Sequence, residues 1–145
     1  MRLRNTHLLL AVAFLASSGT CVSAQTPGPF TQAQITAGHE NYIGYCSPCH
    51  GEDLAGGGDA PPLTGAFFSQ DWAKYSISQL YAFVANAMPQ GLEGEMKPEE
   101  YSGIIAYLLA ANGAKPGSAT FTGKSDIKIG AITSGKTVQA LVGAQ

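Results

Sequence analysis

The residues best suited to chemistry in this chain are Cys46-Ser47-Pro48-Cys49-His50, in the order C-x-x-C-H. Two thiols at this spacing can each form a thioether with a vinyl group of one porphyrin, and the histidine that follows can bind the iron. A zinc site would need two more Cys or His ligands at similar spacing, which the sequence does not offer. A thioredoxin-like redox pair would need a βαβ context, and no such pattern is visible. The motif therefore predicts one covalently attached haem c, with Cys46 and Cys49 as attachment sites and His50 as an iron ligand.

The N-terminus has the pattern of a secretory signal peptide. Arg2 and Arg4 form a positive region, residues 8–16 form a short apolar run, and Val22-Ser23-Ala24 provides small residues before a cleavage point. The apolar run is shorter than the roughly 20 residues that span a bilayer, so we expect no transmembrane segment in the mature chain. An uncleaved anchor and a lipid attached to Cys21 are the alternatives. We predict that residues 1–24 are removed on export to the periplasm, a compartment that agrees with haem attachment outside the cytoplasm.

The mature chain has a restricted set of ligands and charges. Its only imidazoles are His39 and His50, and its only thioethers are Met88 and Met96. Residues 25–145 contain six lysines, no arginine and ten acids, a balance that does not fit nucleic-acid binding, which relies on a basic footprint. The length of roughly 120 residues suits one small domain.

Three helices are predicted between residues 31 and 113. Thr31, with Gln34 three residues later, forms a capping box for a helix through Tyr45, and a second such box begins a helix at Ser76. Pro98 favours the start of a third helix, and Asn112-Gly113 favours its end. A glycine- and proline-rich stretch at 56–65 separates the first two helices, and strand signals are weak. The sequence predicts an all-α domain over residues 25–114.

The segment from 115 to 145 differs in composition. It is rich in Gly, Ser, Thr and Ala and has no strong apolar stripe, so we expect a flexible or partner-binding tail. Residues 127–132 and 137–142 contain enough β-branched side chains to pair as short strands on a partner.

These features, in this order, resemble a class I cytochrome c over about residues 31 to 113. The similarity is greatest to the monohaem cytochrome c domains and subunits associated with quinoprotein alcohol dehydrogenases. It implies an all-α fold of three to five helices around one haem. The matching stretches are Gly38-x-x-x-Tyr42-x-x-x-Cys46-x-x-Cys49-His50-Gly51, Ala60-Pro61-Pro62-Leu63-x-Gly65-x-x-Phe68, Asn86-Ala87-Met88-Pro89, and Tyr101 through Asn112-Gly113.

The resemblance implies a role for each matching position. His50 would be the proximal ligand and Met88 the distal one, while the carbonyl of Pro62 would accept the outer N–H of His50. Gly38 would let the first and last helices cross closely. Pro89 disfavours helical backbone at Met88, so the Met88 side chain can turn inward from an extended loop. Met96 is the alternative ligand, although its position also suits a hydrophobic staple at the start of the third helix.

The expected function is single-electron transfer by a periplasmic monohaem cytochrome, without enzymatic activity of its own. The expected partners are redox proteins, with a periplasmic dehydrogenase as electron donor and a terminal acceptor downstream. A fixed subunit of a dehydrogenase complex is a second form of the same role. The alternatives are a haem-based ligand sensor or catalyst with an open sixth iron position, and a haem-free module with an ordinary Cys46–Cys49 disulfide.

Overall fold

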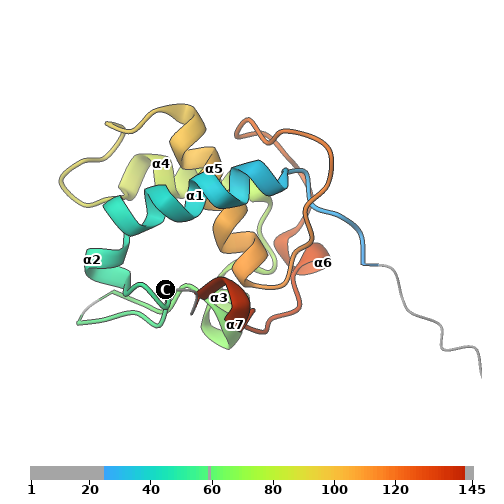
Figure 1. Ribbon diagram of the computed structural model, residues 1–145, viewed down its shortest axis with the longest axis horizontal. Helices are drawn as coiled ribbons and strands as arrows, with labels where there is room; N and C mark the ends of the chain where they lie inside the picture. Colours follow the sequence, from blue (N-terminus) through green and yellow to red (C-terminus); the bar gives the residue numbers. More distant parts are fainter. Residues whose placement is uncertain (1–24, 59, 143–145) are drawn as a thin grey trace, which may run out of the picture.

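The computed structural model describes residues 25–58 and 60–142, so the predicted signal peptide lies outside the described residues. This described part contains seven helices and no β-strand, which confirms the all-α prediction (Figure 1). None of these helices has the length and apolar character needed to cross a bilayer. The helices are α1 (Gln32–Tyr45), α2 (Ser47–His50), α3 (Gly65–Trp72), α4 (Ile77–Ala87), α5 (Pro98–Ala111), α6 (Ile129–Ile132) and α7 (Gln139–Val142).

The predicted helix starts are confirmed. Thr31 caps α1 and Ser76 caps α4, and in each case the glutamine three residues later hydrogen-bonds back to the backbone N–H of the cap. Pro98 is the first residue of α5, and the Glu100 carboxylate accepts the N–H of Lys97 at 2.7 Å. Helix α3 was not predicted, and it begins at Gly65, the last residue of the Gly- and Pro-rich stretch.

Helix α5 is the centre of the fold, because every residue from Tyr101 to Ala111 is buried. It crosses α1 where Gly38 meets Gly103, and a methyl group on Gly38 would overlap the backbone carbonyl of Gly103. The predicted close crossing of the first and last domain helices is therefore present. Tyr107, one turn further along α5, packs against His39 and Tyr42 of α1, with ring centroids 5.0 and 5.3 Å apart.

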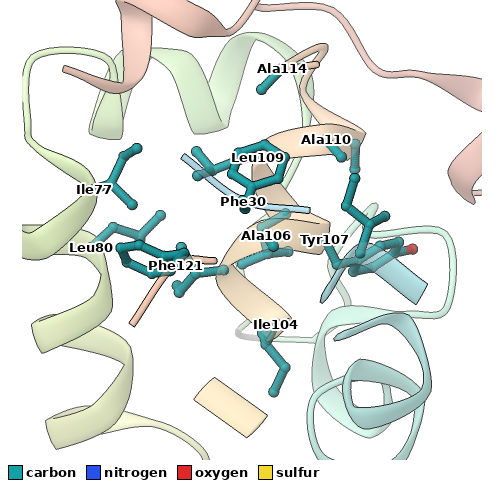
Figure 2. Close-up of a cluster of buried hydrophobic side chains, with 14 of the residues drawn as sticks. Phe30, Ile77, Leu80, Ile104, Ala106, Tyr107, Leu109, Ala110, Ala114 and Phe121 are labelled. Carbon is teal, nitrogen blue, oxygen red and sulfur yellow. The ribbon is translucent and has the colours of Figure 1, made fainter. Parts of the chain in front are cut away.

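The segment after Ala114 packs against this core, contrary to the expectation of a flexible tail. Phe121, Ile129 and Ile132 are at most 2% exposed and belong to the main hydrophobic cluster. Figure 2 shows Phe121 in one cluster with Leu80 of α4 and residues of α5. Two one-turn helices, α6 and α7, occupy the places where strands were expected. The folded domain therefore extends to at least residue 142, rather than ending at 114.

Backbone hydrogen bonds also tie this tail to the domain. The N–H groups of Ile77 and Ser78 at the start of α4 bind the carbonyls of Ile127 and Ser125. The Tyr107 hydroxyl donates to the carbonyl of Leu141 at 3.2 Å. The tail thus contacts α4 and α5, although these helices are distant from it in the sequence. Its few apolar residues pack against surfaces that those helices do not bury by themselves.

Candidate functional site

The C-x-x-C-H motif lies at a sharp change of direction between two helices. Helix α1 ends at Tyr45, and the single turn of α2 follows, so the N–H of His50 bonds to the carbonyl of Cys46 at 3.0 Å. His50 is buried, Cys46 is half-buried and Cys49 is exposed. All three line one open cleft, so the structure brings the predicted attachment sites and iron ligand together.

The cleft is large and its deep wall is apolar. Its volume is about 1510 Å³, above the ~300–1000 Å³ that is common for small-molecule pockets, which leaves room for a large planar macrocycle. The apolar wall comes from α3, α4 and α5, through Phe68, Trp72, Leu80, Val84, Ile104 and Leu108.

The histidine ring is oriented by the loop that follows it. Nδ1 of His50 lies 2.9 Å from the carbonyl oxygen of Pro61. A carbonyl only accepts hydrogen bonds, so Nδ1 carries the proton and Nε2 keeps its lone pair for a metal. The prediction that Pro62 supplies this carbonyl is wrong by one residue. The turn directs the carbonyl of Pro61, the first of the two prolines, at the His50 ring.

A glycine makes this loop geometry accessible. Gly56 has a φ of +81°, and its N–H donates to the carbonyl of His50 at 2.8 Å. A Cβ at Gly56 would lie 2.6 Å from the carbonyl oxygen of Ala60 and 2.9 Å from the carbonyl carbon of Pro61. Only a residue without a side chain lets the chain return closely enough to place Pro61 against His50.

Tyr42 fixes the other end of the motif. Its hydroxyl donates to the carbonyl of Gly51 at 2.6 Å, directly after His50. Burial raises the pKa of Tyr42 well above the usual value for tyrosine, so the hydroxyl stays a neutral donor at physiological pH.

The two candidate methionines lie in different environments. Met88 lines the cleft, whereas Met96 is 7% exposed and belongs to the hydrophobic core. Met88 directly follows α4 in extended backbone, with φ −138° and ψ 147°, as expected for a residue before proline. The hydroxyl of Tyr101 donates to the Met88 carbonyl at 3.3 Å and accepts the Gly94 N–H at 3.0 Å, so α5 anchors the loop that carries Met88.

Comparison with known families agrees with this geometry. Residues 33–108, just over half of the chain, match the family described as cytochrome c oxidase, cbb3-type, subunit III. The chain is a c-type cytochrome of this family. Comparison with curated proteins gave no match. Among solved structures, the sulfane dehydrogenase SoxCD from Paracoccus pantotrophus is similar, with a TM-score of 0.48 and 20% identity over 80% of this chain and 62% of that chain.

The cytochrome's residues fit the haem c that this family carries. Cys46 and Cys49 would form the thioethers, Nε2 of His50 would bind the iron, and Met88 offers a thioether sulfur from elsewhere in the cleft wall. Burial, reinforced by the neighbouring Cys49, raises the pKa of the free Cys46 thiol to about 11. A thioether carries no charge, so haem attachment leaves no buried charge at this position.

One residue of the cytochrome's site was missed by sequence reasoning. Asn112 is fully buried, and its side chain donates to the carbonyl of Leu63 and accepts the N–H of Gly65, both at 2.9 Å. It thereby fixes the loop just after Pro61 to the end of α5. In the sequence, Asn112 has only the pattern of a helix end, and nothing indicates that its side chain is buried and hydrogen-bonded to a distant loop.

Proposed function

We propose that this cytochrome is a single-electron carrier whose iron is held by His50 and Met88. The observation that carries this proposal is that both side chains line one cleft with the two thiols of the motif, while Met96 is packed in the core. Haem supplies the reversible one-electron change between ferrous and ferric iron. The chain supplies the ligands, their orientation and the surrounding dielectric.

The ligand set and its surroundings favour electron transfer over ligand chemistry. A histidine and a thioether together raise the reduction potential. With both positions filled by the protein, no coordination site is open to oxygen, peroxide or another small molecule. The hydrogen bond from His50 to Pro61 fixes the orientation of the imidazole that would bind the iron. A rigid coordination shell reduces the structural change that accompanies each electron.

We further propose export to the periplasm and exchange of electrons with soluble or membrane-associated redox proteins there. The signal-peptide pattern of residues 1–24 and the covalent haem motif support this location. A periplasmic dehydrogenase is the proposed donor, either as a separate protein or as a complex with this cytochrome as a subunit. A terminal acceptor would receive the electron.

A mediated spectroelectrochemical titration tests the proposal. The purified holo-protein is expected to show a low-spin c-type spectrum in both states and a Nernst slope for one electron. The spectrum of the reduced form should not change under carbon monoxide, because Met88 occupies the sixth position. Rapid carbon monoxide binding or high-spin iron would instead indicate a ligand-binding haem protein. A purified protein without haem would contradict both the electron-carrier and the ligand-binding function.

A further inference from the structure

Exposed apolar side chains gather at the opening of the haem cleft. Of seven large hydrophobic residues that are exposed in the described part of the chain, four line the cleft, with exposed fractions between 37% and 50%. They are Tyr45, Tyr75, Phe83 and Leu92, and we refer to them as the rim. The Trp72 ring lies 5.6 Å from that of Tyr75 and 5.2 Å from that of Phe83, so the aromatic part of the rim is held in place.

The charges of the chain are divided between its two parts. Residues 25–114 contain nine acids and two lysines, whereas residues 115–145 contain four lysines and one acid. The formal side-chain charge is therefore −7 before the tail and +3 within it. The excess of negative charge therefore lies in the part of the chain that forms the cleft, and a field of this sign attracts a positively charged partner before contact.

Several of the acids lie beside the rim. Asp71 lines the cleft, where Lys74 is the accompanying cation. Glu93 directly follows Leu92 of the rim and is fully exposed, and the N–H of Gly91 holds the pKa of its carboxyl below the usual value, so it is charged at neutral pH. Glu52 and Asp53 directly follow Gly51, which also lines the cleft. Acids therefore outnumber lysines around the opening.

The tail adds no residue to the lining of the cleft, but it brings one lysine close to the rim. Every residue that lines the cleft falls between Tyr42 and Leu108, so none belongs to the tail. Figure 1 shows α6 and the loop before it on the right, and α2 and the loop joining α4 to α5 on the left. Within the tail, Lys128 pairs with Ser76, and the N–H of Ile129 donates to the carbonyl of Tyr75 at 3.0 Å. Lys128 therefore lies near the Tyr75 side of the rim, where Lys74 is also found.

From this arrangement we infer that the rim is the docking surface for a redox protein with a basic contact face, on which lysines or arginines surround an apolar patch. The inference rests on the proposed electron-carrier function. Opposite charges speed and orient the encounter, and the apolar rim excludes water from the contact.

Oxidation of the reduced holo-protein by two small complexes of opposite charge tests the sign of this surface. Tris(phenanthroline)cobalt(III) is a trivalent cation, and hexacyanoferrate(III) is a trivalent anion. Added salt is expected to slow the reaction with the cation and to speed the reaction with the anion, as measured by stopped-flow absorbance. At low salt, each acid neutralised beside the rim should slow the cation's reaction by about threefold.

Matched double variants locate the effect. One double variant, Asp71→Asn with Glu93→Gln, removes two negative charges beside the rim. The control double variant, Asp126→Asn with Glu40→Gln, removes two negative charges elsewhere, one in the tail and one on the outside of α1. The first pair should slow oxidation by the cobalt complex by about tenfold at low salt, and the second by less than about twofold. Equal effects of the two pairs, or a salt dependence of opposite sign, would overturn the docking inference while leaving electron transfer intact. No oxidation by either complex would overturn both.

A binding measurement tests the surface directly. A short polylysine peptide, added to the diamagnetic ferrous protein, should shift the amide NMR signals of Tyr75, Phe83 and Leu92 and should bind several-fold more weakly to the Asp71→Asn, Glu93→Gln protein. Shifts confined to other surfaces would contradict the assignment of the rim. Polyglutamate is the control, and its effects should fall on the tail around Lys115 and Lys124, which are exposed.

Discussion

The cleft side and the tail side of the molecule complete the same core in different ways. On the tail side, Phe121, Ile129 and Ile132 are buried in the hydrophobic cluster and close it to solvent. On the cleft side, Ile104 and Leu108 of the same helix face an open volume of about 1510 Å³. The protein thus provides its own packing on one side and a prepared apolar surface on the other, which is the division expected when a covalently attached group is a structural part of the fold.

Removal of the tail is expected to have the largest effect on stability. Deleting Gly117–Gln145 would expose the surfaces covered by three fully buried apolar side chains, each worth roughly 1.5–3 kcal/mol. The total of about 5 kcal/mol or more is comparable with the whole stability of a small domain. Denaturant unfolding of the holo-protein should show a large loss or a protein that no longer folds.

A shorter truncation is the control for that deletion. A chain ending after Lys136 keeps Phe121, Ile129 and Ile132 but loses α7, whose apolar residues are only partly buried. Its free energy of unfolding should fall by about 1–2 kcal/mol. If the long deletion costs no more than this short one, the tail is not part of the core.

The next largest effect is expected at Asn112, which joins the two sides. Its side chain binds the cleft loop at Leu63 and Gly65, and its carbonyl accepts the N–H of Ser134 in the tail at 2.9 Å. Asn112→Ala would leave buried backbone groups unpaired and should cost about 2–5 kcal/mol. Because the loop also carries Pro61, the reduction potential should shift as well.

Asn86→Ala is the matched control for Asn112→Ala. The Asn86 side chain is exposed and donates to the carbonyl of Ala82 within its own helix. We expect a change within about 0.5 kcal/mol and an unaltered potential. A potential that is unchanged in both variants would show that Asn112 has no influence on the haem ligands.

The smallest effects are expected at two tyrosines whose rings pack against each other at a tilt but whose hydroxyls bind different sides of the molecule. Tyr42 donates to Gly51 at the haem motif, and Tyr107 donates to Leu141 in the tail. Each Tyr→Phe change removes one hydrogen bond and should cost about 1 kcal/mol. Only Tyr42→Phe should also alter the haem spectrum or potential, so equal spectral changes in both variants would contradict the separation of the two sides.

Local signals predicted the parts of this fold that are determined locally. Helix starts could be predicted because each depends on residues within one turn of helix. They are the capping boxes at Thr31 and Ser76 and the start of α5 at Pro98. The haem-attachment site could be predicted from the C-x-x-C-H motif because its chemistry requires residues that are close together in the sequence. The exposure of Met88 to the cleft also followed from a local effect, that of Pro89 on the backbone before it.

The parts that sequence did not predict depend on contacts between distant segments. Phe121, Ile129 and Ile132 are isolated in a polar stretch, and only the spaces left by the other helices make them core residues. The choice between Pro61 and Pro62 depends on how Gly56 turns the loop, which no pattern in the stretch specifies. Asn112 likewise acquires its role from a loop nearly fifty residues earlier.

The central claim, that His50 and Met88 hold the iron in the cleft, is tested most directly by two volume-conserving variants. Met88→Leu and Met96→Leu each replace a thioether by an apolar side chain of similar size, at a cost expected below about 1.5 kcal/mol. The measurement is the weak far-red charge-transfer band of sulfur-ligated ferric haem. The account predicts that this band is lost in Met88→Leu and retained in Met96→Leu; the reverse result, or retention of the band in both variants, would contradict it.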